Sequence, residues 1–384
     1  MTPRPSILPA PPRPSPALPH ERGSATAAAL LAGVGQALPE HRYRQEEIVA
    51  HLARMWHDRP AVLRRLASLH EHTRVSARHL ALPLQEYEHL DTFGKANDAW
   101  IRVARRLGGE AVRAALAAAG LEAGDLSAIF AATVTGIASP SLDAMLINEL
   151  GLRPDVKRMP LFGLGCVAGA AGLARVADYL RAYPDQAAVL LCVELCSLNF
   201  QREDLSVAAL ISTGLFGDGA AAVVLVGPQH PRAAVAGAAW PELVATRSTF
   251  YPDTEDVMGW DISERGFRIV LSPAVPEVAR TRLPVDVDAF LASQGLGRAD
   301  IAAWIAHPGG PKVLQGMQDG LALTDQDFAL SWQMLAEQGN LSSASVLMVL
   351  GRTLATPGRW PEGSLGLLLA MGPGFCSEVV LLRR

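Results

Sequence analysis

The sequence predicts an α/β protein with five layers, in which helices and sheets alternate, built from two duplicated halves. The first evidence is internal repetition, because segments recur in order along the chain. Residues 121–136 (LEAGDLSAIFAATVTG) resemble residues 296–310 (LGRADIAAWIAHPGG). Residues 165–180 (GCVAGAAGLARVADYL) resemble residues 339–354 (GNLSSASVLMVLGRTL) at nearly the same offset.

A third pair follows the first two in each half. GDGAAAVVLV begins at Gly217 and GPGFCSEVVLL begins at Gly372, and each is a Gly-x-Gly turn that runs into an apolar strand. Each similarity is weak alone, but three in the same order indicate a duplicated unit. We therefore predict an N-terminal half over residues 24–228 and a C-terminal half over residues 229–384. Residues 1–23 are rich in proline and are predicted to be a tail outside both halves.

The second observation is the character of the strands and helices. Short runs that are apolar throughout suit sheets covered on both faces: 128–134, 187–195, 220–227, 303–307, 365–371 and 378–383. The segments after Cys166 and Asn340 are apolar nearly all round and therefore predict two buried central helices between the sheets. Residues 43–119 are predicted to be helical additions.

Composition excludes several functions. The chain has 384 residues, 49% of them hydrophobic, and a net charge of −4, so nothing indicates a nucleic-acid partner. No apolar run reaches the length of a membrane span. The four cysteines (166, 192, 196 and 376) lack metal-ligand spacing, so we expect no metal site, and their small number predicts a reducing, cytoplasmic location.

The duplication makes Cys166 and Asn340 equivalent residues, each at the N-terminus of a central helix. A thiol in that position should have a depressed pKa and act as a nucleophile. His307 ends the strand AWIAH and is followed by PGGP, which would project its imidazole at a strand end. Taken singly, a buried cysteine is more often a small hydrophobe and asparagine is a common helix cap. Their convergence in a duplicated fold favours a catalytic site.

These segments resemble the type III polyketide synthases, the chalcone-synthase-like enzymes of the thiolase fold. The resemblance rests on GCVAGAAGLARVADYL, LFGDGAAAVVL, IAHPGGPKVL, GNLSSAS and MGPGF, and it runs from about residue 25 to the C-terminus. It implies a thiolase-like five-layer αβαβα sandwich, a Cys166–His307–Asn340 triad and a homodimer. It also implies acyl-CoA and malonyl-CoA as substrates, with no cofactor beyond these thioesters.

The resemblance further implies a set of residues that contact the substrate. Phe216 matches an aromatic gate, although ordinary core packing is the alternative, and Ile269 replaces a second, aromatic gate with an aliphatic residue. The remaining implied pocket positions are Thr135, Ser139, Cys196, Asn199, Ser342 and the loop Gly372, Pro373, Gly374 and Phe375. Ser139 and Pro140 fall where the family runs a loop, often with a cis proline, into the partner subunit's cavity.

For the coenzyme A entrance the candidates are Arg65, Arg74 and Arg78, although a solvated basic helix face would explain them equally well. The motifs around MGWDI and MGPGF look like those of bacterial alkylpyrone and alkylresorcinol synthases, which implies medium- to long-chain fatty acyl starters. Three alternatives stay open: a condensing enzyme like ketoacyl-ACP synthase III, fed by malonyl-carrier protein; a cysteine hydrolase; and an inactive scaffold subunit.

Overall fold

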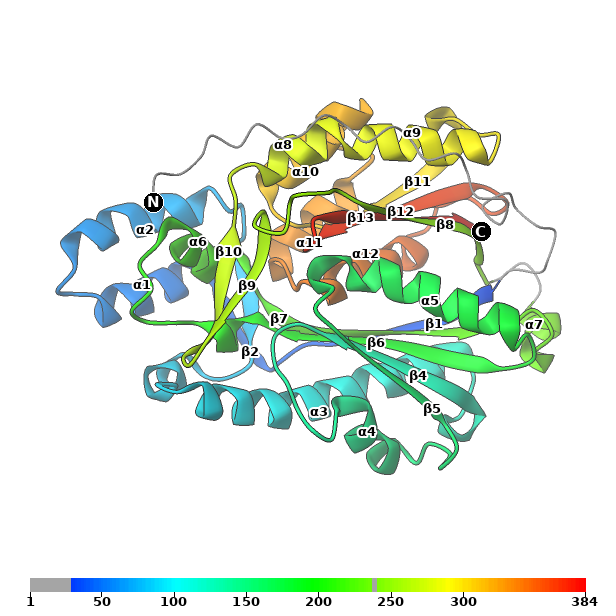
Figure 1. Cartoon of the computed structure of the whole chain (residues 1–384), viewed down its shortest axis with the longest axis horizontal. Coiled ribbons are helices and arrows are strands. Elements are labelled where there is room, and N and C mark those ends of the chain that lie inside the picture. The colour runs from blue at the N-terminus through cyan, green and yellow to red at the C-terminus, as the bar shows by residue number, and fades with distance from the viewer. Residues whose placement is uncertain (1–28, 237–239) are drawn as a thin grey trace.

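The computed structural model describes residues 29–236 and 240–384, and these residues form five layers (Figure 1). A helical layer lies on the outer face of each of two sheets, and two central helices fill the space between the sheets (Figure 1). The predicted five-layer fold is confirmed. The proline-rich tail over residues 1–23 lies outside the described residues, and the boundary between residues 228 and 229 stays a prediction.

Within the described residues, nine strands form one continuous sheet in the order β11-β12-β13-β8-β1-β7-β6-β4-β5. We describe it as two sheets that meet where β1 pairs with β8: the first has the order β5-β4-β6-β7-β1, and the second has the order β11-β12-β13-β8. The first-sheet strands are β1 (Ala29–Ala37), β4 (Leu126–Thr133), β5 (Lys157–Phe162), β6 (Ala187–Leu195) and β7 (Asp218–Val226). The second-sheet strands are β8 (Glu242–Phe250), β11 (Ile301–Ala306), β12 (Leu365–Gly372) and β13 (Cys376–Arg383). All six predicted strands are present.

The two sheets repeat one topology. β4 runs parallel to β6 as β11 runs parallel to β12, and β7 is antiparallel to β6 as β13 is antiparallel to β12. A short pairing of β1 with β8, at Ala29–Leu243 and Leu30–Glu242, joins the sheets edge to edge. The duplication predicted from the three segment pairs is therefore confirmed strand by strand.

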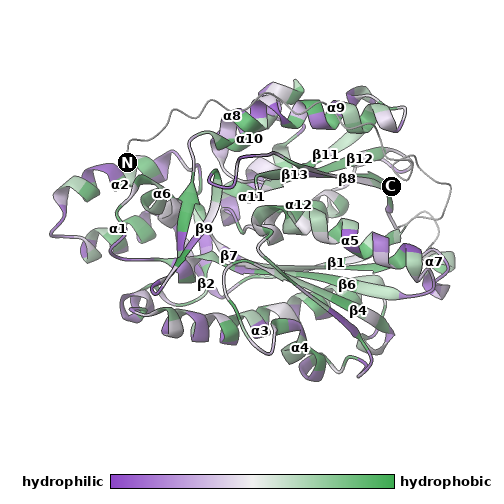
Figure 2. Ribbon diagram, viewed as in Figure 1, coloured by the Kyte–Doolittle hydropathy of each residue, from purple (hydrophilic) through white to green (hydrophobic). Residues whose placement is uncertain are grey.

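The central helices are α5 (Ala168–Ala182) and α12 (Ser343–Ala355), which contact each other and both sheets. They are buried over most of their length because small and apolar residues cover nearly their whole circumference. The hydropathy colouring shows green on both sheets and on these helices, with purple mainly on the outer helices (Figure 2). These two buried helices form the central layer, with one sheet on each side of them.

The remaining elements cover the outer faces and one end of the sandwich. Helices α3 (Phe93–Ala119) and α4 (Leu142–Leu150) cover the first sheet, and α8 (Val275–Thr281), α9 (Leu283–Ser293) and α10 (Pro311–Leu321) cover the second (Figure 1). The other elements are α1 (Gln45–Met55), α2 (Pro60–Glu71), α6 (Val207–Leu215), α7 (Pro231–Ala236), α11 (Ala329–Gln338) and two ribbons, β2 (His41–Arg44) with β3 (Ala77–Leu80) and β9 (Met258–Ser263) with β10 (Gly266–Leu271). The helical additions predicted over residues 43–119 are present, together with the β2–β3 ribbon.

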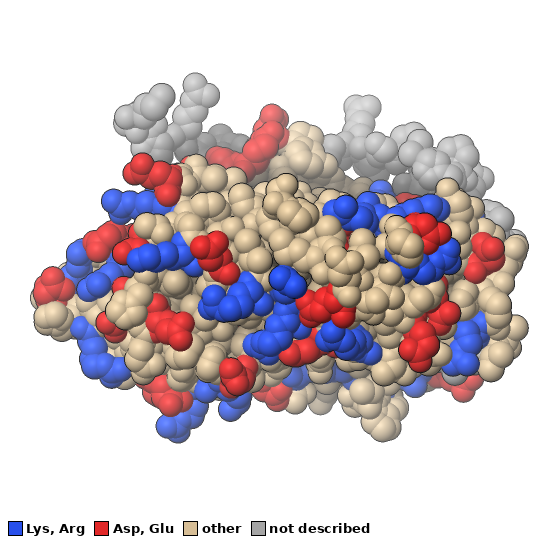
Figure 3. Space-filling view, turned by 90° about the horizontal axis from the view of Figure 1, so that it is seen from below, with Lys and Arg blue, Asp and Glu red and all other residues tan. Residues whose placement is uncertain are grey.

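Acidic and basic side chains are interspersed over the face formed by α3 and α4, with no large patch of one sign (Figure 3). Within the two described ranges, no helix combines the length and the apolar character that crossing a bilayer requires.

The contact between the central helices depends on Gly169. A Cβ atom at this position would lie 2.4 Å from the Ser343 carbonyl oxygen and 2.7 Å from Cγ1 of Val346, so any side chain would force α5 and α12 apart. We expect Gly169→Val to lower the free energy of unfolding by about 3 kcal/mol, the upper end of the range for overpacked cores. Denaturant unfolding measures the change.

The matched control is Gly124→Ala, because a Cβ atom at this exposed position meets no atom within 4 Å. We expect its stability to stay within about 0.5 kcal/mol of the wild type. If Gly169→Val unfolds at the wild-type denaturant concentration, the central helices do not pack as described.

Candidate active site

Cys166 lies where the chain turns from β5 into α5. A short 3₁₀ turn, Gly165–Val167, precedes the helix, and Gly165 has a φ of 55°, a conformation that glycine adopts without strain. A Cβ atom there would lie 2.7 Å from Cδ of Pro373, so glycine also allows the 372–375 loop to approach the turn that holds Cys166. The thiol is buried and donates to Oγ of Ser342, with Sγ and Oγ 3.6 Å apart.

Asn340 occupies the equivalent position before α12. Its Oδ1 accepts a hydrogen bond from the backbone N–H of Ser342 at 2.7 Å, and its Nδ2 donates to the carbonyl oxygen of Gly309 at 3.0 Å. The first contact fixes the tight turn into the helix, where Ser342 has a φ of 45°. The second leaves one N–H of the amide for the Cys166 thiol or a ligand, and a hydrogen bond from this side chain lowers the pKa of Cys166.

His307 directly follows β11, where its backbone N–H donates to the carbonyl oxygen of Leu369. The residue is 2% exposed, and neither ring nitrogen has a hydrogen-bond partner. Burying an unpaired polar atom costs about 1–3 kcal/mol. The two unpaired ring nitrogens therefore indicate that a bound molecule pairs with them. Burial lowers the pKa of His307 to about 3, which keeps the ring neutral.

The expectation of a depressed thiol pKa is wrong for this structure. Burial raises the pKa of Cys166 to about 11; the hydrogen bond to Ser342 lowers it only in part, and the Glu194 carboxylate raises it. The desolvation of a thiolate in this apolar site outweighs the favourable field of the helix N-terminus. The two groups are therefore a neutral thiol and a neutral imidazole in this structure.

The three residues share one cavity of about 640 Å³, as the duplication predicted. Ser68, His72 and Lys312 line this cavity and are exposed, so the cavity opens to the surface at these residues, which we call its mouth. A thiol, a neutral imidazole and an amide thus line one cavity that opens to the surface.

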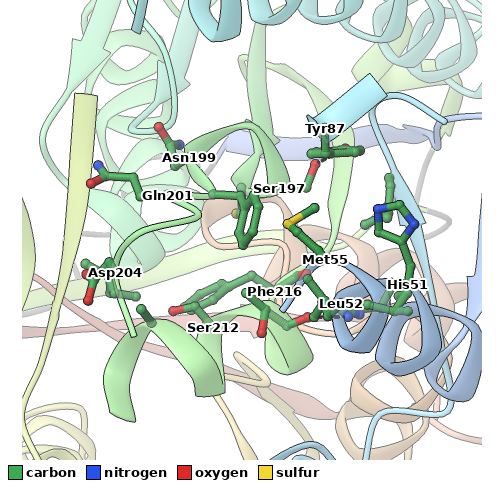
Figure 4. A pocket seen from close by; sticks show the side chains of 18 of the residues that line it. His51, Leu52, Met55, Tyr87, Ser197, Asn199, Gln201, Asp204, Ser212 and Phe216 are labelled. Atoms are coloured by element: carbon green, nitrogen blue, oxygen red, sulfur yellow. Dashed lines mark hydrogen bonds between the residues drawn. The ribbon is translucent and has the colours of Figure 1, made fainter. Parts of the chain in front are cut away.

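A second, smaller chamber of about 100 Å³ adjoins the first, between α1, α6 and the β9–β10 ribbon (Figure 4). Met55 and Leu52 of α1 line it opposite Asn199 and Gln201 (Figure 4). Four residues line both spaces and therefore form the wall between them: Cys196, Phe216, Trp260 and Ile269. We refer to these four residues as the dividing wall.

The predicted pocket residues divide into two groups. Those that line one or both spaces are Phe216, Ile269, Cys196, Asn199, Ser342, Pro373 and Phe375. Gly372 and Gly374 lie in the same loop without lining the cavity. Sequence reasoning missed Trp260, although MGWDI was singled out, because nothing in the motif shows that its side chain points inward.

The prediction that Thr135 lines the substrate pocket is wrong. Its hydroxyl donates to Oε2 of Glu194 at 2.9 Å and it lines neither space, because the side chain faces this buried carboxylate. Glu194 also accepts hydrogen bonds from the Val134 N–H and the Ser343 hydroxyl, and burial raises its pKa to about 7. The lone acidic residue in the apolar strand AAVLLCVEL was the signal for this network, and it was missed. Ser139 is exposed and precedes Pro140 in a cis peptide bond, as expected for that loop.

None of the three arginines suggested for coenzyme A lines the cavity. Arg65 is exposed on α2, and the Arg74 guanidinium lies 5.1 Å from the centroid of the Trp332 ring. Arg78 is a correction: it is buried and donates to protein carbonyl groups, so it cannot reach a phosphate at the surface. Lys312, in the PGGPK segment after His307, is instead the lysine at the mouth.

A duplicated five-layer fold with a buried cysteine, histidine and asparagine around one cavity defines an acyl-transferring condensing enzyme. Residues 19–229 match the family of N-terminal domains of chalcone and stilbene synthases. Residues 242–384 match the family of C-terminal domains of the same enzymes. It belongs to this family, the type III polyketide synthases, which are acyltransferases that catalyse decarboxylative condensation.

Among its relatives is a 1,3,6,8-tetrahydroxynaphthalene synthase of Streptomyces peucetius subsp. caesius, 52% identical over 92% of each chain. A 3,5-dihydroxyphenylacetyl-CoA synthase of Streptomyces toyocaensis is 33% identical over 98% of this chain and 91% of that protein. The crystal structure of 1,3,6,8-tetrahydroxynaphthalene synthase from Streptomyces coelicolor superposes with a TM-score of 0.84 at 33% identity, over 93% of this chain and 99% of that one.

The site yields a prediction for Asn340. We expect Asn340→Asp to reduce malonyl-CoA decarboxylation about 10²- to 10³-fold, because a carboxylate repels a developing enolate oxygen and supplies no N–H. The aspartate keeps the acceptor for the Ser342 N–H, so the turn should persist. Release of carbon dioxide from malonyl-CoA measures the step without any starter.

Asn199→Asp is the matched control, because Asn199 lines only the second chamber. We expect its decarboxylation rate to stay within a few-fold of the wild type. Equal losses in both variants would show that the negative charge, and not the position of Asn340, causes the defect.

Proposed function

We propose that this type III polyketide synthase primes itself with malonyl-CoA, extends the chain with further malonyl-CoA and closes it to a polyhydroxylated aromatic product of the tetrahydroxynaphthalene class. The 52% identical relative carries that activity in its name. Oxygens at positions 1, 3, 6 and 8 of a naphthalene have the alternating spacing that two-carbon units leave. The proposal needs coenzyme A thioesters and no other cofactor.

Each residue of the triad has a role in this proposal. Sγ of Cys166 attacks the carbonyl carbon of the starter thioester while His307 takes the thiol proton, which then leaves with the coenzyme A thiolate. An extender malonyl-CoA loses carbon dioxide, and the resulting enolate oxygen accepts hydrogen bonds from the His307 ring and the Asn340 amide. The enolate carbon attacks the Cys166 thioester and expels the thiolate, so the chain grows on coenzyme A before it returns to the cysteine.

The choice of a short, malonyl-derived starter rests on the dividing wall. This wall lies between the cavity around Cys166 and the second chamber, which holds only about 100 Å³. By the same measure the cavity around Cys166 holds about 640 Å³, so the second chamber adds little space to it. A long alkyl tail therefore gains little room beyond the wall, whereas a short malonyl-derived starter needs none.

The second candidate is the alkylpyrone or alkylresorcinol synthase implied by the motifs, with a medium- to long-chain fatty acyl starter. The apolar side chains that line the main cavity favour it, among them Val207, Ile211, Met258, Leu271 and Met317. Each buried methylene of a tail would contribute roughly 0.8 kcal/mol. The tail would have to lie along this cavity beside the extender.

One experiment separates the two candidates. The purified protein is incubated with malonyl-CoA alone, and in parallel with acyl-CoA starters of graded length, beside a Cys166→Ala control. The proposal predicts an aromatic product from malonyl-CoA alone, identified by mass spectrometry. Products that form only with a fatty acyl-CoA would contradict it and support the second candidate.

We expect Trp260→Ala to open the dividing wall and to raise the relative use of acyl-CoA starters of medium length at least about tenfold, because removing the indole joins the two spaces. Competition between malonyl-CoA and a medium-chain acyl-CoA, read as product ratios, measures the shift. Met258→Ala, which alters the main cavity but not the wall, is the control. An unchanged ratio in Trp260→Ala would show that the wall does not limit the starter.

We propose that Lys312, with His72 and Ser68 beside it, binds the phosphates of coenzyme A at the mouth. Lys312→Glu should raise the KM for malonyl-CoA about tenfold, equivalent to about 1.4 kcal/mol, with a smaller change in kcat. Lys157→Glu is the control, because Lys157 lies over the Tyr183 ring, beyond the C-terminal end of α5. A changed kcat at unchanged KM in Lys312→Glu would contradict this assignment.

The proposal includes a homodimer and a cytoplasmic location. Ile137, near the Ser139–Pro140 bond, is 45% exposed and Phe162, next to the nucleophile turn, is 49% exposed. Large exposed apolar side chains of this kind support a partner surface. All four cysteines are free thiols, which fits a reducing compartment.

A further inference from the structure

Arg78 is an unusual residue for the interior of this protein. It lies on β3 and is 2% exposed. Its Nη1 donates to the carbonyl oxygen of Phe216 at 2.6 Å, and its Nη2 donates to the carbonyl oxygen of Thr213 at 2.6 Å and to Oε1 of Gln45 at 3.1 Å. A buried cation is expensive unless it is paired, so these contacts need a functional explanation.

The contacts of Arg78 belong to a wider capping arrangement at the C-terminus of α6. The last carbonyl groups of a helix have no partner within it, and a cation there also favours the helix dipole. The carbonyl oxygen of Gly214 accepts from Nε2 of Gln45 at 2.8 Å and from the Thr73 hydroxyl at 3.3 Å. Arg78, Gln45 and Thr73 thus fix the position of the segment that ends in Phe216 of the dividing wall.

The same segment is bound directly to the backbone of Asn340. The Asn340 N–H donates to the carbonyl oxygen of Leu215 at 2.9 Å, and the Gly217 N–H donates to the Asn340 carbonyl oxygen at 3.0 Å. Phe216 and Asn340 therefore form an isolated β-bridge. A Cβ atom on Gly339 would lie 3.0 Å from Cδ of Arg78, so the arginine stem also packs against the residue that precedes Asn340.

A nearby carboxylate favours the charged form of this arginine. Burial lowers the pKa of Arg78 to about 10, and the Asp218 carboxylate opposes that shift. Asp218 itself accepts hydrogen bonds from the backbone N–H groups of Ala81 at 2.6 Å and Ser197 at 2.9 Å. The guanidinium therefore stays charged near neutral pH, and its donors remain committed to the end of α6.

We propose that Arg78 is a positioning residue that sets the place of Phe216 in the dividing wall and of Asn340 in the triad relative to Cys166. One buried guanidinium then couples two properties of the enzyme, the decarboxylation rate and the length of the chain that the cavity accepts. The inference rests on the condensing reaction of the family and not on the choice of starter.

Arg78→Lys tests the proposal. Lysine keeps the charge and the stem, but it offers all its donors from one atom and cannot span the Thr213 and Phe216 carbonyl oxygens as the guanidinium fork does. We expect malonyl-CoA decarboxylation to fall about tenfold and the product distribution to shift toward other chain lengths, with a melting temperature within a few degrees of the wild type. A merely structural residue would not change the product distribution.

Arg359→Lys is the matched control. Nη2 of Arg359 also donates to two backbone carbonyl oxygens, Gln326 at 2.6 Å and Asp327 at 2.5 Å, and the residue lines neither space. We expect its decarboxylation rate and products to match the wild type. The proposal is overturned if folded Arg78→Lys keeps the wild-type product distribution, or if its activity falls only in proportion to the unfolded fraction.

Gln45→Met is the second variant, used if Arg78→Lys does not fold. It removes one acceptor of Arg78 and one donor to Gly214 while the arginine stays in place. We expect a smaller shift of the same kind, and an unchanged product distribution in this folded variant would overturn the proposal. Wild-type decarboxylation without any aromatic product would contradict the malonyl-primed function alone, because the decarboxylation test of Arg78 needs no starter.

Discussion

The close contact of two buried helices is the constraint on which the site depends. α5 and α12 approach so closely at Gly169 and Ser343 that a single Cβ atom would not fit between them. Because each helix begins beside its partner's first turn, the residues that precede them, Cys166 and Asn340, face one cavity. The sheets on either side supply the third residue, since His307 directly follows β11.

Burial gives the site its chemical character. In water, a thiol, an imidazole and an amide would each be solvated, whereas here desolvation raises the pKa of Cys166 and lowers that of His307. Both groups rest neutral, and the unpartnered ring nitrogens of His307 keep their hydrogen-bonding capacity for a ligand. Hydrogen bonds to a developing enolate are stronger in such an apolar cavity than in water.

The sequence predicted the parts of the structure that repeat or alternate. Three pairs of similar segments in the same order were sufficient to predict the five layers. The reason is that the strands of the second half run in the same relative directions as those of the first. The pairing of Cys166 with Asn340 followed from the duplication, because these are equivalent positions in the two halves, and the triad with His307 followed from the family resemblance. The sequence could not predict the direction in which individual side chains point, however. Thr135 turns toward Glu194 and Arg78 turns inward beneath Phe216, and no local pattern reports which way a residue on a short strand points. The thiol pKa was misjudged for a related reason, because the depth of burial depends on the whole fold.

The most direct test of the account is to identify the acyl group that malonyl-CoA alone leaves on the enzyme. The protein is mixed with malonyl-CoA, quenched, digested and analysed by mass spectrometry for adducts on each of its four cysteine peptides. The account predicts a malonyl-derived acyl thioester on Cys166 and none on the other three. An unmodified Cys166 that becomes acylated only by fatty acyl-CoA would contradict the malonyl-primed function, and acylation of another cysteine would contradict the site itself.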